Sequence, residues 1–335
     1  MQHTNRGCDA LPGSLGILFG ATVSSFLLFI APLSAQTKKT ILCEPTRSVN
    51  LIAPLVAQKK AIFQKEGLDV DVVQALSSVC IAGLVSKSID YTTTFGSDVM
   101  SASLKGLPVR GLMAMHTGSD YGFLARKGIA DFKDLSGKTV GVSRVGSGAD
   151  TVARFLLERH GLTPGSMVKI SPLGSMEARV TALQQGLVAA AIISMPGAFE
   201  VERKGAKALV WGPDVPDLPF LNGLTTTVEK IETRPDEVRG MIRSILRANR
   251  FIRENKEQSV ALLKEWMKIS QDLAEKSYDV TLPGFSLTGE PRQSVLKFLL
   301  EQAKKDSGVK EDIPLSKVFD AAPLKAAQKD LGIGG

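Results

Sequence analysis

Cysteine and histidine are scarce in this sequence, with three of each among 335 residues. They show no close spacing, so the sequence offers no zinc site of the usual cysteine and histidine type. Beyond the first 35 residues, only Cys43 and Cys80 remain as cysteines. They could form a disulfide in an oxidising compartment or be two small buried side chains, and the sequence leaves both possibilities open.

Aromatic side chains and recognisable catalytic motifs are also few. Phe, Trp and Tyr make up 6% of the chain, so large stacking surfaces are not expected to be its main means of binding. A Gly-x-Ser-x-Gly elbow, a phosphate-binding Gly-Lys-Ser/Thr loop and a His-Glu-x-x-His motif are all missing from the sequence. His116 and His160 have no acid and nucleophile arranged around them. These absences favour a protein that is not an enzyme and uses no cofactor or metal.

The sequence lacks a clustered basic stripe as well. Its formal net charge is +7, but Lys and Arg are scattered, with acidic residues between them. This distribution argues against nucleic acid as a partner and argues weakly for small anionic ligands. With 44% hydrophobic and 22% charged residues, the composition is that of an ordinary globular protein, and the length predicts roughly two domains.

The first 35 residues differ from the rest of the chain. Arg6 and Asp9 are their only charged side chains, residues 15–33 carry no charge, and the small-residue end Leu33-Ser34-Ala35 precedes a polar stretch. A basic start, an apolar run and a small-residue end are typical of a secretory signal peptide. We therefore predict a signal peptide over residues 1–35 and a periplasmic or otherwise extracytoplasmic protein. A retained membrane anchor is the alternative, which the glycines and the proline inside the run make less favourable.

Short apolar runs alternate with helical patterns from residue 40 onward, which is typical of an α/β protein. Strands are expected over residues 40–43, 68–73, 91–94, 109–115, 122–125, 138–142, 167–170, 188–193, 207–211 and 224–227. Helices are expected over residues 51–66, 77–87, 175–185 and 196–204. A short helix is expected after Gly96, and another runs through His160 and ends at Gly161. The stretch from 235 to 308 is expected to be mainly helical.

In this layout, one α/β unit is bracketed by two pieces of another. We predict a first lobe over residues 36–128 plus 224–335 and a second lobe over 129–223, with the chain crossing near 126–131 and 212–223. A chain that crosses twice between two lobes has the connectivity of a protein with a hinged cleft. The predicted fold class is therefore α/β, with two α/β sandwiches, a hinge and a helical C-terminal part.

The glycine-rich turn of residues 141–150 lies between an expected strand and an expected helix. Ser147 stands three residues before an acidic residue, as in a capping box, and Gly146 and Gly148 allow close approach to the first helical amides. A helix start carries partial positive charge, so it suits a carboxylate, sulfonate or phosphate, and Arg144 could add charged donors. A plain helix cap with a solvent-facing Arg144 is the alternative.

Polar residues also follow other expected strands, at the strand ends where open α/β sheets bind ligands. His116 follows such a strand and could face the cleft, although a surface turn is the alternative. We predict that the ligand is bound by residues of these turns, namely Arg47, Ser48, Asn50, Thr94, Phe95, Gly96, Ser97, His116, Ser143, Arg144, Gly146, Ser147, Gly148, Ser194 and Asn222.

Five ordered stretches carry a family resemblance: residues 53–58, 63–70, 125–129, 134–142 and 182–186. Through them, the chain from about Thr40 to about Leu224 resembles the nitrate/sulfonate/taurine class of ABC-transporter substrate-binding proteins, which is related to the thiamine-pyrimidine-synthase-like fold. The resemblance implies a type II periplasmic-binding-protein fold with the ligand between the lobes. By that likeness, the ligand would contact the turns after the first and third strands and the Gly146–Gly148 helix start.

The chain departs from the family pattern at a few scaffold positions. Ala61 and Ser88 stand where the family usually has Gly, and Ala189 stands where Asp is common, which questions loop geometry more than function. The fungal enzyme branch of the family carries a run of closely spaced cysteines that is absent here, and its histidine has no match in this sequence.

The layout and the resemblance together predict an extracytoplasmic, monomeric solute-binding protein. It would capture a small, anionic organic molecule, such as a sulfonate, a carboxylate or a pyrimidine-like compound, and deliver it to an ABC-transporter permease in the membrane. A pyrimidine-synthase-like enzyme on the same fold and an extracytoplasmic ligand sensor are the alternatives. The enzyme would require His116 to lie close to acidic residues of the cleft.

Overall fold

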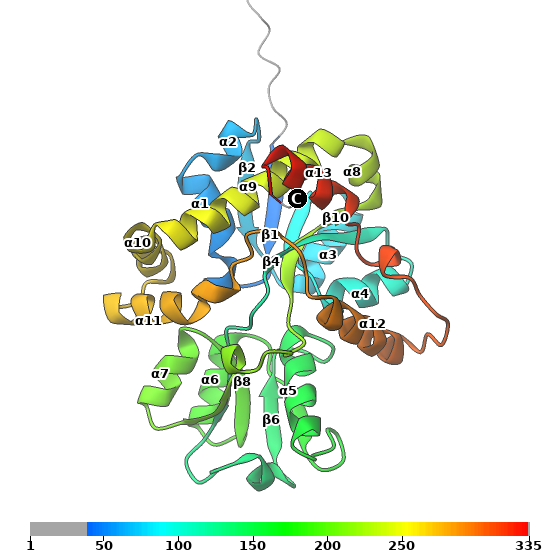
Figure 1. Cartoon of the computed structure of the whole chain (residues 1–335). Coiled ribbons are helices and arrows are strands. Elements are labelled where there is room, and N and C mark those ends of the chain that lie inside the picture. The colour runs from blue at the N-terminus through cyan, green and yellow to red at the C-terminus, as the bar shows by residue number, and fades with distance from the viewer. Residues whose placement is uncertain (1–38, 334–335) are drawn as a thin grey trace, which may run out of the picture. The chain divides into compact units, whose positions relative to one another are not determined.

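Two five-stranded mixed sheets organise the computed structural model, which describes residues 39–333 (Figure 1). The first sheet has the strand order β2-β1-β3-β10-β4. Its strands are β1 (Thr40–Glu44), β2 (Val70–Gln74), β3 (Tyr91–Thr94), β4 (Val109–His116) and β10 (Asn222–Thr227). Strands β2 and β3 run parallel to β1, whereas β10 is antiparallel to β3 and β4. The predicted signal peptide over residues 1–35 lies outside the described residues.

The second sheet has the strand order β7-β6-β8-β5-β9. Its strands are β5 (Tyr121–Ala125), β6 (Thr139–Val142), β7 (Lys169–Pro172), β8 (Ala190–Ser194) and β9 (Lys207–Trp211). Strand β5 is antiparallel to both β8 and β9, so the chain enters this sheet at Tyr121. The prediction of a first crossing near 126–131 is therefore wrong, because the chain crosses between His116 and Tyr121. The connection between β4 and β5 is short enough to resemble a turn within one lobe, which is why the pattern misplaced β5.

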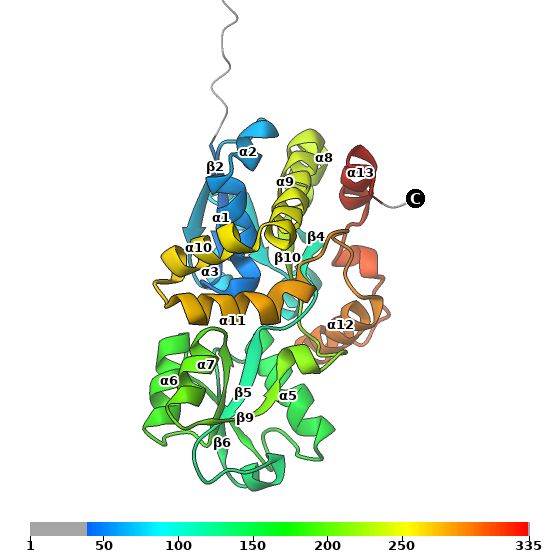
Figure 2. The same ribbon diagram turned by 60° about the vertical axis from the view of Figure 1, so that its left-hand side comes forward.

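We call the part built on the first sheet lobe 1 and the part built on the second sheet lobe 2. The helices of lobe 1 are α1 (Ile52–Lys59), α2 (Ile62–Lys65), α3 (Ser77–Val85), α4 (Ser97–Leu104), α8 (Val228–Thr233), α9 (Pro235–Glu254), α10 (Lys256–Met267), α11 (Gln271–Thr281), α12 (Gln293–Ser307) and α13 (Ala322–Asp330). Those of lobe 2 are α5 (Gly148–Arg159), α6 (Met176–Gln184) and α7 (Gly197–Arg203). Helix α5 covers one face of the second sheet and α6 and α7 cover the other (Figure 2). Within residues 39–333, no helix combines the length and the apolar character needed to span a membrane.

The helix predicted over residues 51–66 is interrupted near its middle. Helix α1 ends at Lys59 and α2 begins at Ile62, with Ala61 between them in the left-handed region at a φ of 55°. For a residue with a Cβ atom, the left-handed conformation costs roughly 1–2 kcal/mol, so packing of neighbouring residues has to stabilise the turn at Ala61. The side chains of Ile62 and Phe63 are buried directly after the break and anchor the turn. The turn thus forms with alanine where the similar family usually has glycine.

Apolar side chains from the first sheet and from one face of the long helix α9 make the core of lobe 1. Leu112 and Met113 of β4 are fully buried, as are Met241 and Ile245 of α9. The spacing of four residues puts the two α9 side chains on the same helical face. Burying each such side chain contributes about 1.5–3 kcal/mol, so this buried face of α9 stabilises its packing on the sheet.

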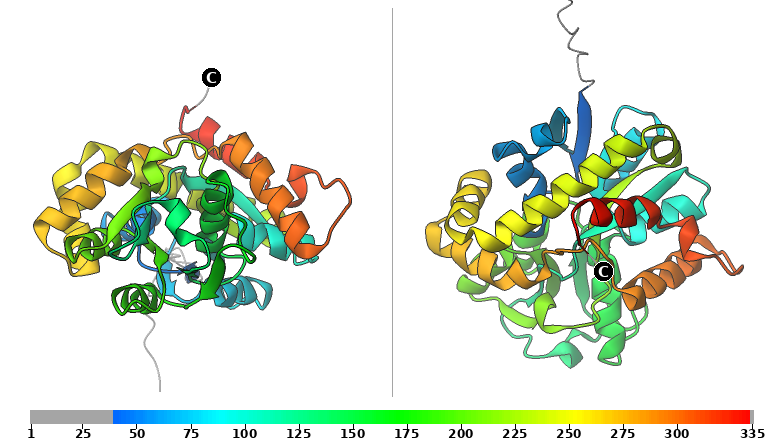
Figure 3. Two further views of the ribbon diagram at one scale, coloured as in Figure 1. Left: turned by 90° about the horizontal axis from the view of Figure 1, so that it is seen from below. Right: turned by 45° about the horizontal axis from the view of Figure 1, so that its top comes forward.

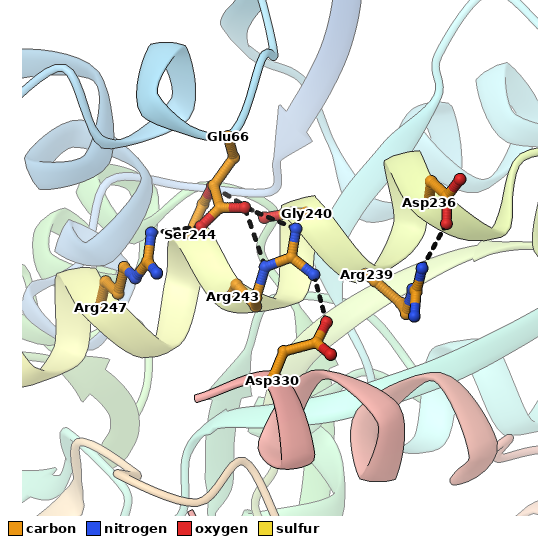
Figure 4. A network of polar contacts seen from close by, with 8 residues as sticks. All are labelled: Glu66, Asp236, Arg239, Gly240, Arg243, Ser244, Arg247 and Asp330. Carbon is orange, nitrogen blue, oxygen red and sulfur yellow. Dashed lines mark hydrogen bonds and ion pairs between the residues drawn. The ribbon is translucent and has the colours of Figure 1, made fainter. Parts of the chain in front are cut away.

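A polar network ties α9 to the helices on either side of it. Glu66, at the end of α2, accepts hydrogen bonds from Arg243 at 2.8 Å and 2.6 Å and also pairs with Arg247 (Figure 4). Arg243 reaches on to Asp330 of α13 at 2.5 Å. Helix α13 lies alongside α9 (Figure 3, right). The Glu66 side chain is only 6% exposed, so its pairing with two guanidinium groups compensates for its burial.

Cys43 and Cys80 form a disulfide, which answers the question that the sequence left open. The bond joins β1 to α3, with 5.6 Å between the two Cα atoms. Both cysteines are fully buried. The disulfide therefore connects the ends of two segments, residues 44–48 and 74–78, that lie at the edge of the first sheet.

Candidate ligand-binding cleft

A pocket of about 480 Å³ lies between the two lobes and is lined by residues of both. Lobe 1 contributes the turns after β1 and β3 and the start of α3. Lobe 2 contributes the turns after β6 and β7, the end of β8 and the start of α6. These turns follow the carboxyl ends of the strands, where open α/β sheets bind their ligands. The volume is in the range of small-molecule sites, which typically measure about 300–1,000 Å³.

Most of the residues predicted from the sequence line this pocket. They are Ser48, Asn50, Thr94, Phe95, Gly96, Ser97, Ser143, Arg144, Ser147, Gly148, Ser194 and Asn222. The turns that carry them are far apart in the sequence, and the two sheets bring them together. Whether each residue contacts the ligand remains a proposal that binding experiments on variants would test.

Two predicted residues, Arg47 and Gly146, do not line the pocket. The Arg47 guanidinium is exposed and donates a hydrogen bond to the carbonyl oxygen of Trp266 at 3.2 Å, outside the cleft. The Gly146 amide is used within its own turn, where it donates to the Asp150 carboxylate at 2.8 Å. Placing these two residues in the site was therefore wrong. Each sits in the right turn, but the side chain or the amide faces away from the pocket.

His116 is also outside the pocket, although it is buried. Its Nδ1 lies 2.8 Å from the carbonyl oxygen of Gly118, and its Nε2 lies 2.9 Å from that of Thr281. The ring packs edge-on against Phe285, with 4.9 Å between the ring centroids. Burial lowers the pKa of His116, and the two backbone contacts partly oppose that shift. The prediction that His116 faces the cleft is wrong, because the ring is held between these backbone segments of lobe 1.

The start of α5 has the local structure expected from the sequence. The Ser147 hydroxyl accepts a hydrogen bond from the Asp150 amide at 3.4 Å and donates one to the Arg144 carbonyl at 2.6 Å. A Cβ atom on Gly148 would lie 3.6 Å from the ring of Phe220, so the helix start packs closely against the pocket wall. The Asp150 carboxylate, however, lies beside the same turn and pairs with Arg154. Its negative charge offsets part of the attraction that the helix start would exert on an anion.

Arg144 pairs across the cleft instead of facing the pocket with a free charge. Its Nη2 lies 2.5 Å from the carboxylate of Asp98, which belongs to α4 of lobe 1. Burial raises the pKa of Asp98, and the contacts with Arg144 and Ser77 oppose that shift. The Arg144 side chain is 45% exposed. Its charge is thus largely used by Asp98, and the pair joins the two lobes.

Sequence reasoning missed four charged residues that line the pocket, namely Asp98, Asp120, Glu177 and Arg179. Of these, Asp120 and Arg179 are buried. Asp120 is 1% exposed and lies in the crossing between β4 and β5. Arg179 is 6% exposed and lies on α6, where it donates to the backbone oxygens of Ile192 and Ser175. Asp120 was missed because the crossing was placed several residues too late. Arg179 was missed because a charged residue in a polar helix gives no sequence signal that it points inward.

Asp120 is held by two residues of the turn after β1. The Ser48 hydroxyl donates to one oxygen of its carboxylate, and the Asn50 side-chain amide donates to the other at 2.9 Å. Burial raises the pKa of Asp120 to about 6, while the Ser48 bond and the nearby charge of Arg179 favour the ionised form. The Asn50 Oδ1 is buried and has no hydrogen-bond partner among residues 39–333. The turn after β1 thus holds the Asp120 carboxylate in place in the pocket lining.

Known proteins share this arrangement of the chain. The ligand-binding component of an ABC-type import system from Staphylococcus aureus matches with a TM-score of 0.71 and 18% identity, covering 86% of this chain and 98% of that one. The periplasmic aliphatic sulphonate-binding protein SsuA of Escherichia coli matches with a TM-score of 0.70 and 18% identity, covering 84% and 97%. The desulfurization enzyme DszB matches with a TM-score of 0.62 and 16% identity, covering 88% and 99%. At such identities the likeness shows the fold, and it confirms the predicted periplasmic-binding-protein fold.

Sequence comparison gives the family. A binding protein of Brucella abortus strain 2308, whose name states no ligand, is 26% identical over 245 residues, which cover 70% of this chain and 72% of the relative. Residues 48–259 match the family described as NMT1/THI5 like, in agreement with the resemblance seen in the sequence. Because this match spans more than half of the chain and includes turns of both lobes, the protein belongs to the NMT1/THI5-like family.

Proposed function

We propose that this protein is an extracytoplasmic solute-binding protein that captures a small organic anion and delivers it, as a monomer, to an ABC-transporter permease in the membrane. The observation that carries the proposal is the pocket of about 480 Å³ between the lobes, lined by polar turns from both sheets. The similar import-system component and the sulphonate-binding protein support it through their shared fold.

The pocket favours an organic molecule over a very small inorganic anion. Its walls include the rings of Phe95, Tyr121 and Phe220 beside the polar turns, so part of the ligand would be apolar. A nitrate ion would leave most of this space unfilled. A sulfonate, a carboxylate or a pyrimidine-like compound would fill it better.

The enzyme alternative required His116 to lie close to acidic residues of the cleft, and the position of this side chain does not support it. His116 lies between backbone carbonyls of lobe 1 instead of beside acidic cleft residues. The pocket lining within residues 39–333 includes neither histidine nor cysteine. Because the enzyme DszB has a similar fold, the fold by itself does not decide the matter. Binding without turnover would decide it.

A thermal-shift screen followed by X-ray scattering tests the proposal. The screen would cover sulfonates, carboxylates, aminopyrimidines and nitrate, because a ligand at a hundredfold its dissociation constant stabilises a protein by about 2.7 kcal/mol. We expect at least one organic anion to raise the melting temperature, to be recovered unchanged, and to reduce the radius of gyration by closing the lobes. No stabilisation by any compound, or conversion of a bound compound into a product, would contradict the proposal.

A further inference from the structure

The ion pair between Arg144 and Asp98 bridges the pocket from one lobe to the other. Arg144 lies in the turn after β6 of lobe 2, and Asp98 lies in the first turn of α4 in lobe 1. The two residues are 46 positions apart in the sequence, and both line the pocket. At 2.5 Å from Nη2 to the carboxylate, the pair exists only while the two lobes are close together. Its formation is therefore coupled to the closing of the cleft.

This pair differs in burial from the other ion pairs between the lobes. Within residues 39–333, the others are Arg203–Asp272 and Glu202–Lys276, both between α7 and α11. All four of their side chains are more than one third exposed, whereas the side chain of Asp98 is 11% exposed. Water and salt screen an exposed pair strongly and a partly buried pair much less. The Arg144–Asp98 pair is thus the strongest electrostatic contact between the lobes.

The burial of Asp98 makes the closed cleft depend on Arg144. Burial raises the pKa of Asp98, and the contacts with Arg144 and Ser77 are what favour its ionised form. A charge that is buried without its partner costs more free energy than an intact pair. If Arg144 were neutral, closing the lobes would leave Asp98 with Ser77 alone, so the open form with a hydrated carboxylate would be favoured.

The contacts on this side of the cleft continue along α5. The Thr151 hydroxyl donates to the Ser97 hydroxyl at 3.4 Å, and both side chains are buried. Four residues further on, Phe155 packs edge-on against Phe298 of α12. The spacing places Thr151 and Phe155 on the same face of α5. Like the ion pair, these contacts are formed by the protein alone and require no ligand.

We propose that the Arg144–Asp98 pair is a latch that holds the two lobes together before any ligand is bound. In the ligand-free protein the open and closed forms exchange, and the pair favours the closed form. Arg144 then strengthens ligand binding by raising the fraction of the protein that is closed, without contacting the ligand. The inference goes beyond the proposed function, because it concerns the protein without ligand.

Distances between spin labels on the two lobes test the latch without a ligand. Labels would be attached at Lys105→Cys in lobe 1 and Leu187→Cys in lobe 2, which are exposed, in a protein that also carries Cys8→Ser. The disulfide keeps Cys43 and Cys80 from reacting. We expect a shorter and a longer distance. Raising the salt from about 0.05 M to about 0.5 M should lower the closed-to-open ratio at least about threefold, because salt screens the partly exposed pair.

Variants assign this response to the pair. Arg144→Gln and Asp98→Asn should each lower the closed-to-open ratio by about three- to tenfold at low salt. The double variant should be no more open than either single one, because both changes remove the same interaction. Arg203→Gln, the same substitution in an exposed pair between the lobes, is the matched control and should change the ratio by less than about twofold. Melting curves would show that each variant is folded.

Three results would overturn the latch. Wild-type protein could show the longer distance alone, Arg144→Gln could keep the wild-type ratio, or Arg203→Gln could open the lobes as strongly as Arg144→Gln. Effects of the two single variants that multiply in the double variant would also contradict it, since they would then act separately. If Asp98→Asn does not fold, the salt response and Arg144→Gln still decide. Because no ligand is used, none of these results bears on the proposed function, and a failed ligand screen would not bear on the latch.

Discussion

Two buried acids, Asp120 in the pocket lining and Glu44 at the end of β1, have different surroundings. Asp120 has two side-chain donors and a nearby guanidinium, and its pKa is raised to about 6 by burial. Glu44, the last residue of β1, is 4% exposed, and its Oε1 has no hydrogen-bond partner among residues 39–333. Burial raises the pKa of Glu44 to about 8, with only the charge of Arg47 opposing the shift. Asp120 can thus serve a ligand as a carboxylate near neutral pH, whereas Glu44 is mainly a neutral acid.

Replacing Glu44 with Gln should change how stability depends on pH. The folded protein holds the Glu44 proton up to a pKa of about 8, while the unfolded chain loses it near the ordinary glutamate pKa of 4.5. Between these values the folded state binds more protons, so wild-type stability falls as the pH rises. In the Glu44→Gln variant this contribution is absent. Its free energy of unfolding relative to wild type should therefore increase from about pH 5 to about pH 8, as measured by urea unfolding.

Parallel pH profiles for the two proteins would contradict this prediction. Glu254→Gln, at the exposed end of α9, is a suitable control because it changes the same chemical group at the surface. Its profile should follow that of wild type. A difference confined to Glu44 would assign the effect to burial.

At the scale of secondary-structure elements, the disulfide fixes β1 to α3. The segments that follow Cys43 and precede Cys80 both line the pocket, the first with Ser48 and Asn50 and the second with Ser77. A bond between their ends limits how far these two walls can separate. The disulfide therefore supports the position of the Ser48 and Asn50 side chains that hold Asp120.

Removing the disulfide should destabilise the protein and weaken ligand binding. The bond closes a loop with a sequence separation of 37 residues. Loops of this size correspond to a stabilisation of about 2–4 kcal/mol. We expect the double variant Cys43→Ala/Cys80→Ala to lose about this amount in urea unfolding, with a several-fold weaker affinity. Thiol labelling of the denatured, unreduced wild-type protein checks the bond itself. If both Cys43 and Cys80 react, the disulfide does not form.

At the scale of the whole described structure, contacts on two sides of the cleft join the lobes. On one side, Phe155 of α5 packs edge-on against Phe298 of α12, with 5.5 Å between the ring centroids. On the other side, Arg203 of α7 pairs with Asp272 of α11, and the two helices lie close together (Figures 1 and 2). The α7–α11 pair is exposed and contributes about 0–1 kcal/mol. The aromatic contact is the better candidate for holding the lobes closed.

Phe298→Ala should weaken ligand binding although Phe298 does not line the pocket. An edge-on aromatic pair contributes about 0.5–1.5 kcal/mol, so its loss from the closed state should raise the dissociation constant by about two- to tenfold. Calorimetry on a ligand found in the screen would measure this change. Leu187→Ala, which shortens an exposed side chain of lobe 2, should leave the affinity unchanged. An equal affinity of Phe298→Ala and wild type would mean that this contact does not influence closure.

Much of the site could be predicted because its turns have local signals. Ser147 and Gly148 stand at the start of α5 after a strand, and Thr94 to Ser97 run from the end of the β-branched strand β3 to the start of α4. Their place at strand ends is therefore readable from the sequence. What a local pattern does not contain is the direction of a side chain. Arg144 and Arg179 are equally charged, yet one pairs with Asp98 at the rim and the other is buried in the cleft.

The sequence by itself determined the α/β class, the family and the turns that surround the ligand pocket, because hydrophobic periodicity and turn residues act over a few neighbouring positions. The tertiary structure decided the lobe to which β5 belongs and the roles of Asp120 and Arg179. It also decided the pairing of Cys43 with Cys80. These features depend on contacts between segments that are distant in the chain, such as Ser48 with Asp120. Burial and charge pairing arise only when both sheets are packed, so no local pattern could contain them.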